Sequence, residues 1–103
     1  MKIIVACMLL CLFILGCSES IKYYGKHYQQ HHDFKSLKEA VALIPLNADT
    51  AYVKSILGEP ISMGFDYRYL VDSVSPNGCA VGAVFHINSK GEIDNKWIDE
   101  ICE

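Results

Sequence analysis

The middle of the chain has apolar residues at the spacing of amphipathic helices. The first predicted helix begins near Asp33 or Ser36, where Ser36 and Glu39 have the S-x-x-E spacing of a capping box, and Pro45 ends it. A second predicted helix covers residues 49–57, between a capping aspartate and a glycine. Together the two segments predict an αα-hairpin.

The second half of the chain changes to a period of two, which is typical of strands with one buried face. Apolar and polar residues alternate over residues 65–72 and again over 79–87, and a third segment contains Ile93 and Trp97. Turn sequences rich in serine, asparagine and glycine separate the segments. The predicted fold is α+β, a two-helix hairpin packed on a three-stranded antiparallel meander in the order ααβββ.

The turn of the last hairpin predicts its register. With Gly91 in the left-handed conformation, Ile87 opposes Ile93 and the apolar residues share one face. The pairs that follow are Phe85 with Asn95 and Ala83 with Trp97. A two-residue loop would set Ile87 against Asp94 and Phe85 against Lys96, which buries less apolar surface, so the first register is preferred.

Cys79 and Cys102 are expected to form a disulfide if the chain enters an oxidising compartment, and the first residues of the chain have the pattern of a secretory signal. The preferred register places Cys79 opposite Ile101, so the bond needs a bulge or a relaxed strand end. The successive apolar residues Trp97 and Ile98 indicate such an irregularity. Two buried free thiols are the alternative.

The first sixteen residues form a separate unit, because a positive residue precedes a continuous apolar run. Lys2 is followed by thirteen apolar residues over 3–15, and Gly16 places a small residue before Cys17. This run is shorter than the roughly 20 apolar residues of a membrane-spanning helix. The pattern predicts a signal peptide over residues 1–16.

The residues Ile14-Leu15-Gly16-Cys17 resemble the lipobox of bacterial lipoproteins. The resemblance implies that Cys17 becomes an acylated N-terminus, carrying palmitate-type chains that anchor the protein to the bilayer without crossing it. Ser18 stands where an aspartate would favour retention in the inner membrane, so the outer membrane is favoured. An ordinary signal peptide, with Cys17 after the cleavage site by chance, is the alternative.

Residues 17–32 are polar and aromatic without a sustained period, which predicts a lipidated cysteine and tether ahead of a small domain over 33–103. His27, His31 and His32 lie in this segment. On a helix, His27 and His31 would share a face and could hold a transition metal. No set of further ligands accompanies them, so a solvated linker without metal is the preferred interpretation.

The composition excludes several classes of function. With 9 basic against 12 acidic residues, the chain has no electrostatic footprint for nucleic acid. It contains no nucleophile-elbow, zinc-helix, phosphate-loop or C-x-x-C motif. His86 lies in the middle of a predicted strand with nothing local to orient it as a base. We therefore expect a non-catalytic protein without a cofactor.

Four aromatic residues could serve either the core or a partner surface: Tyr52, Tyr67, Tyr69 and Trp97. In a small domain with few other large residues, most of them are expected to fill the core. Tyr67, Tyr69 and Trp97 are the candidates for partner binding, because any of them left exposed on the sheet would mark an interface.

Three segments together resemble the SmpA/OmlA family of small outer-membrane lipoproteins. They are a helix with Asn47-Ala48-Asp49, Val53, Leu57-Gly58 and Pro60, a strand with Tyr67 and Tyr69, and the hairpin Val84-Phe85-His86-Ile87-Asn88-Ser89-Lys90-Gly91-Glu92-Ile93. That family includes the smallest accessory lipoprotein of the β-barrel assembly machine. Its two-helix, three-strand fold is shared with the repeats of β-lactamase inhibitory protein.

The resemblance and the signal sequence lead to two expectations of function. The first is an envelope lipoprotein that binds another envelope protein as an assembly or scaffolding module. The second is an inhibitor or immunity module against a periplasmic or extracellular enzyme, with the loop over residues 73–78 as its contact. An enzyme would require a buried carboxylate beside His86 in a deep pocket.

Overall fold

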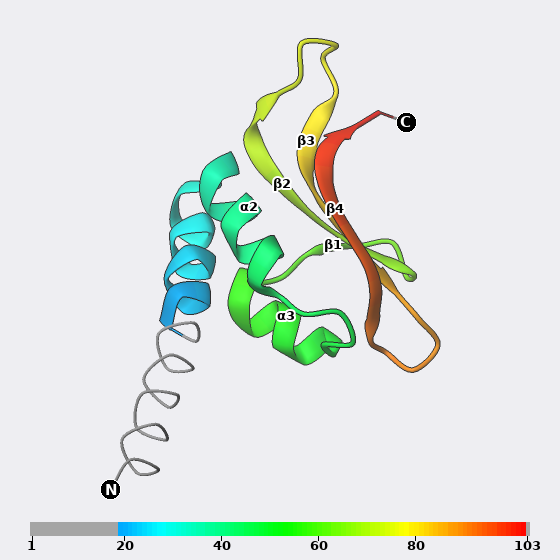
Figure 1. The fold of residues 1–103 in the computed structure, drawn as a ribbon. Helices are drawn as coiled ribbons and strands as arrows, with labels where there is room; N and C mark the ends of the chain where they lie inside the picture. Colours follow the sequence, from blue (N-terminus) through cyan, green and yellow to red (C-terminus); the bar gives the residue numbers. More distant parts are fainter. Residues whose placement is uncertain (1–18, 103) are drawn as a thin grey trace, which may run out of the picture.

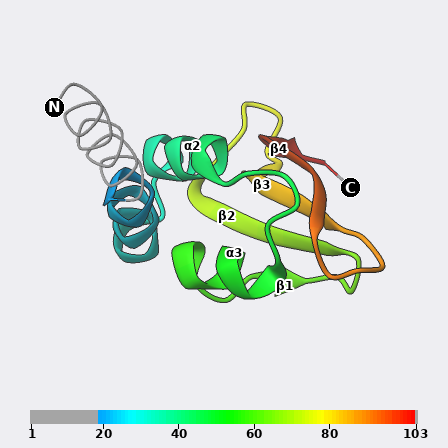
Figure 2. The ribbon, with the colours of Figure 1, turned by 60° about the horizontal axis from the view of Figure 1, so that its bottom comes forward.

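The computed structural model of the protein describes residues 19–102. A helix covers residues 19–31, and α2 (Phe34–Leu43) and α3 (Thr50–Leu57) follow it. The strands β1 (Ile61–Ser62), β2 (Asp66–Val74), β3 (Ala80–Ile87) and β4 (Ile93–Ile101) form one antiparallel sheet in the order β1-β2-β3-β4. The described helices lie on one face of this sheet (Figures 1 and 2).

The predicted α+β class is confirmed, but the order ααβββ is wrong in two details. A two-residue edge strand, β1, pairs Ile61 with Arg68 and makes the sheet four-stranded. A run of two residues is too short to show a period, so the pattern could not reveal it. In addition, residues 19–31 form a helix that packs on the domain, where a tether over residues 17–32 was expected.

The ends of α2 and α3 follow from their capping residues. The Asp33 carboxylate accepts the amide of Ser36 at 3.0 Å, and the Asp49 carboxylate accepts the amide of Tyr52 at 2.8 Å. Gly58 ends α3 with a φ of 87°. Of the two predicted starts for the first helix, Asp33 is correct, because Ser36 is buried within the first turn of α2 and does not cap it.

The helix over residues 19–31 packs closely on the domain. Ile21 and Tyr28 are 5% and 4% exposed and belong to the core. The Tyr28 hydroxyl donates to the Leu70 carbonyl at 2.6 Å, and burial raises its pKa to about 12. Between them, Gly25 lies so close to α3 that a Cβ there would be 2.2 Å from the Ile56 carbonyl oxygen. Tyr24 packs partly against the same core. The other residues of the segment are mostly polar, which is why it resembles a tether.

We expect Gly25→Ala to destabilise the protein, although alanine is the better helix former by about 1 kcal/mol. The added methyl group must push the helix away from the Ile56 carbonyl, and overpacking of this kind costs about 1–3 kcal/mol. Urea unfolding of the variant measures the loss. Gln30→Ala is the matched control on the exposed side of the same helix. A Gly25→Ala variant as stable as this control would show that the helix does not pack closely.

Strand β4 carries a β-bulge near its start. Ile87 pairs with Ile93 as predicted, but the register then shifts, and both Asp94 and Asn95 lie opposite His86. Beyond the bulge Phe85 pairs with Lys96 and Ala83 with Ile98, so the expected pairs of Phe85 with Asn95 and Ala83 with Trp97 are wrong. The irregularity was expected near Trp97 and Ile98, and it occurs three residues earlier.

The bulge decides which side chains of β4 face the helices. Residues paired across an antiparallel sheet share a face, and a shift of one residue exchanges the two faces. Ile98 therefore packs against the core beside Ala83, while Trp97 lies on the opposite face with Val84. Without the extra residue, Asn95 would be directed at the buried Phe85 and Ile98 at solvent.

The same shift brings Lys96 to the end of α2. Its ammonium group donates to the carbonyls of Val41 at 2.7 Å, Ala42 at 3.3 Å and Ile44 at 2.6 Å. These carbonyls have no partner within the helix, and the negative end of the helix dipole attracts the cation. Partial burial lowers the pKa of Lys96. Lys96 thus supplies the basic group that the last turn of α2 lacks.

Lys96→Met removes the three hydrogen bonds and keeps the apolar stem of the side chain. We expect the free energy of unfolding to fall by about 1–3 kcal/mol, the range for hydrogen bonds to charged groups. Lys90→Met is the control, because Lys90 is exposed in the turn between β3 and β4, and we expect it to change stability by less than about 0.5 kcal/mol. Equal urea midpoints for the two variants would contradict the capping role of Lys96.

Candidate functional site

The face of the sheet opposite the described helices carries a group of apolar side chains. The register places Ile61, Arg68, Val84 and Trp97 in one row across all four strands on this face. Val84 is 4% exposed although it is not part of the helix-side core, so its neighbours on the open face bury it. We define the open-face patch by its apolar members: Ile61, Met63, Leu70, Val84, Trp97 and Ile101.

The patch combines exposure with a shallow cavity. Ile61, Met63 and Trp97 are 51%, 45% and 42% exposed. A cavity of about 220 Å³ on the same face is lined by Ile61, Met63, Arg68, Leu70, Ala80 and Ile101. Small-molecule sites usually measure roughly 300–1,000 Å³, so this space suits one apolar side chain of a partner better than a separate ligand.

Of the three aromatic candidates, only Trp97 lies on the open face. Tyr69 is 3% exposed on the helix side, where its hydroxyl donates to the Gly58 carbonyl at 2.9 Å and burial raises its pKa. Tyr67 packs against the same core, with the Lys54 ammonium 5.5 Å from its ring centre. The expectation that most of the four aromatics fill the core is correct for Tyr67 and Tyr69 and wrong for Tyr52 and Trp97, which are 38% and 42% exposed. Tyr67 and Tyr69 are therefore not open-face contacts.

His27, Asp33 and Ser36 form a polar cluster where the helix over residues 19–31 meets α2. The His27 Nδ1 atom is 3.0 Å from an Asp33 carboxylate oxygen and 2.7 Å from the Ser36 hydroxyl. Burial raises the pKa of Asp33, but hydrogen bonds from Ser36 and His27 outweigh this effect and lower it to about 2. A catalytic relay needs the serine and the carboxylate on different ring nitrogens. Here both lie on Nδ1, which does not match the geometry of a relay. The contacts instead join the helix over residues 19–31 to the start of α2.

The other histidines of this segment differ in environment. The rings of His27 and His31 lie 4.4 Å apart, on one helix face as expected from their spacing. His32 has a φ of 51° after the end of the helix and packs edge-on against Tyr28. Within residues 19–102, these histidines are not part of a cluster of three potential metal ligands.

His86 has a partner that the sequence analysis missed. Its Nδ1 atom is 2.6 Å from an Asp94 carboxylate oxygen, and the bulge in β4 brings Asp94 to this position. The two side chains are 47% and 44% exposed. An enzyme was expected to require a buried carboxylate beside His86, and this carboxylate is open to solvent.

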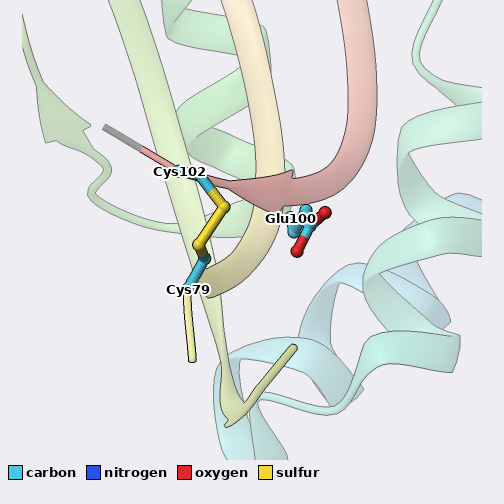
Figure 3. Close-up of side chains that lie close together, drawn as sticks. All are labelled: Cys79, Glu100 and Cys102. Carbon is cyan, nitrogen blue, oxygen red and sulfur yellow. A yellow bond between two sulfur atoms is a disulfide. The ribbon is translucent and has the colours of Figure 1, made fainter. Parts of the chain in front are cut away.

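Cys79 and Cys102 form the expected disulfide, with their Cα atoms 5.2 Å apart (Figure 3). The bulge provides the irregularity that the bond needs, because Ala80 now pairs with Ile101 and Cys79 lies across from Cys102. Glu100 lies beside the two sulfurs, its carboxylate within 4.8 Å of them, and accepts from the Asn77 amide at 3.3 Å. Since both sulfurs are bonded to each other, neither is a thiolate that could bind a metal.

Removal of the disulfide by Cys79→Ser with Cys102→Ser should lower the free energy of unfolding by about 3 kcal/mol, because the bond restricts the unfolded chain. The closed loop spans a sequence separation of 23 residues. Urea unfolding with and without a dithiol reductant measures the loss, and the double variant should not respond to the reductant. A wild-type midpoint that does not change on reduction would contradict a structural role.

The predicted signal peptide over 1–16 and Cys17 lie outside the described residues. Within residues 19–102, the structure contains no helix that is long and apolar enough to span a membrane. No protein-family model matches the chain, and neither curated proteins nor solved structures include one with significant similarity to it. The resemblance to the SmpA/OmlA family therefore stays a prediction.

Proposed function

We propose that the protein is a bacterial envelope lipoprotein, anchored by acyl chains on Cys17, that binds another envelope protein without catalysing a reaction. The lipobox sequence supports the anchor, with the outer membrane favoured. The observation that carries the binding role is the open-face patch. It combines the exposed Trp97 with a cavity, lined by Ile61 and Met63, that can accept a side chain, and no described helix covers this face.

The composition of the patch favours a protein partner. Trp and Arg are the residue types most often found at the energetic centre of interfaces, and Trp97 and Arg68 flank the buried Val84 in one row. The acidic residues Asp66 and Asp99 share this face with the patch. A partner with an apolar anchor and a basic rim would complement it.

Anchoring also strengthens weak contacts. Two proteins held at the same membrane surface meet at a raised effective concentration, so a small patch can give a stable complex. This role as an assembly or scaffolding module agrees with the resemblance to the SmpA/OmlA family.

We test the proposal with a photoreactive benzoylphenylalanine in place of single residues in cells that express the lipoprotein. At Ile61, irradiation should give one discrete adduct in the membrane fraction, because this exposed residue of the open-face patch lines the cavity. At Tyr52, which is 38% exposed on α3, we expect no such adduct. Adducts of equal yield at both positions, or none from Ile61, would contradict the proposed surface.

The photoreactive probe at Ile61, combined with Trp97→Ala, tests how much Trp97 contributes to partner binding. Truncation of an interface tryptophan typically costs 2 kcal/mol or more, so we expect the adduct yield to fall by at least about tenfold. Stability should change little, because Trp97 is 42% exposed outside the helix-side core. An unchanged yield would exclude Trp97 as an anchor.

The inhibitor or immunity role remains a second candidate, favoured by the hairpin loop between β2 and β3. Val74, the last residue of β2, is 68% exposed where the loop begins, and the disulfide joins the other end of the loop to Cys102 after β4. The Ser75 backbone amide donates to the Cys79 carbonyl at 2.9 Å across the loop. The same photoreactive probe at Val74 distinguishes the roles: an adduct with a soluble enzyme from Val74, and none from Ile61, would favour inhibition.

A further inference from the structure

The distance between the proposed lipid anchor and the folded domain is very short. Glu19 is already helical, two residues after Cys17, and Ile21 is part of the core. Two residues of fully extended chain span at most about 7 Å. If Cys17 carries acyl chains in a bilayer, the first turn of this helix must lie at the surface of that bilayer.

The helix cannot act as a flexible spacer without breaking its contacts with the domain. Gly25 lies against the Ile56 carbonyl, the Tyr28 hydroxyl donates to Leu70, and the Gln29 amide donates to the Ile56 carbonyl at 2.9 Å. These contacts join the helix to both α3 and β2. The helix and the rest of the described domain therefore move as one body, and the two residues before Glu19 limit their distance from the anchor.

The side chains at this end of the helix suit a lipid headgroup layer. Lys22, Tyr23 and Lys26 are exposed, and Tyr23 is 64% exposed. Glu19 is also exposed at this end, so the two lysines leave a net charge of +1 there. Lysine ammonium groups on flexible stems bind anionic headgroups, and tyrosine rings are enriched at membrane interfaces. The first two turns of the helix thus combine the two residue types that membrane surfaces favour.

The remaining charge of the domain has the opposite sign. From residue 59 onward, acidic residues outnumber basic ones: Glu59, Asp66, Asp72, Glu92, Asp94, Asp99, Glu100 and Glu103 against Arg68, Lys90 and Lys96. An anionic surface would attract the lysines of the helix and repel the sheet. Attraction of the lysines and repulsion of the acidic residues therefore both favour an orientation with the helix end at the lipid surface and the sheet away from it.

We propose that the end of the helix near Glu19, with Lys22, Tyr23 and Lys26, is seated on an anionic bilayer surface. This inference depends on the proposed acylation of Cys17 and adds to it a fixed orientation. The acidic sheet and the open-face patch are held away from the lipid, where another protein can reach them. The start of α2 lies at the far end of the helix (Figure 1), about 20 Å from residue 19 given 1.5 Å per residue.

Amine labelling of the native lipoprotein in vesicles tests this seating. The full mature protein is reconstituted in vesicles of phosphatidylglycerol and phosphatidylcholine, in phosphatidylcholine alone, or in neutral detergent, and treated with a water-soluble acetylating reagent. We expect Lys22 and Lys26 to react at least about threefold more slowly on the anionic vesicles than in detergent, with weaker protection on phosphatidylcholine. Lys35 and Lys38 are exposed at the far end of the helix and should react equally in all three.

The same digests separate failure of the seating from failure of the anchor. The mass of the peptide that begins at Cys17 reports acylation. An acylated Cys17, with Lys22 and Lys26 reacting as fast on anionic vesicles as in detergent, overturns the seating and leaves the anchored lipoprotein intact. An unmodified Cys17 overturns both proposals.

Trp97 supplies an independent measure of orientation, because it is the one tryptophan of the chain. Brominated lipids quench tryptophan only at close range. We expect the fluorescence of Trp97 to be the same on vesicles with and without brominated lipid. Quenching of Trp97 would show that the open face lies on the bilayer and would overturn the proposed orientation.

Discussion

The arrangement of this domain depends on one extra residue in β4. Ile93 is held at one end of the strand, because its backbone exchanges hydrogen bonds with Asn47 at 2.8 Å and with Ala48 at 2.9 Å. The Cys79–Cys102 disulfide holds the other end. From Ile87 back to Cys79 is eight residues, whereas from Ile93 to Cys102 is nine. Both ends can be joined only if β4 accommodates one residue more than β3, and the bulge at Asp94 does so.

Several features of the sheet follow from that mismatch. The bulge directs Lys96 to the C-terminal carbonyls of α2 and Ile98 to the core, so the helix layer is capped and packed from β4. The same shift moves Trp97 to the open face, where it joins a patch that β1 extends with Ile61. The bulge that directs Ile98 into the core thus also leaves Trp97 exposed on the other face. The face opposite the described helices is left for the proposed partner.

Local sequence signals predicted the elements that depend on local chemistry. Asp33 and Asp49 set the starts of α2 and α3, and the turn at Gly91 set the pairing of Ile87 with Ile93. The bulge could be anticipated as a requirement of the disulfide, but its position depends on contacts with α2 and with the loop before α3, which are distant in sequence. The register preferred from burial alone therefore placed Trp97 on the wrong face.

The helix over residues 19–31 was missed for a related reason. Its core positions, Ile21, Gly25 and Tyr28, have helical spacing, but the middle one is a glycine that a hydrophobic pattern does not count. Glycine is needed at position 25 because a Cβ there would clash with the Ile56 carbonyl of α3. The open-face patch was equally hidden, since Ile61, Met63 and Ile101 lie at strand ends and meet only through the sheet.

Cross-strand nuclear Overhauser effects between β3 and β4 measure this register most directly. The bulged register predicts contacts between the backbone protons of Ala83 and Ile98 and of Val84 and Trp97. Contacts between Ala83 and Trp97 instead would place the tryptophan on the helix side, and the account of the open face would be contradicted.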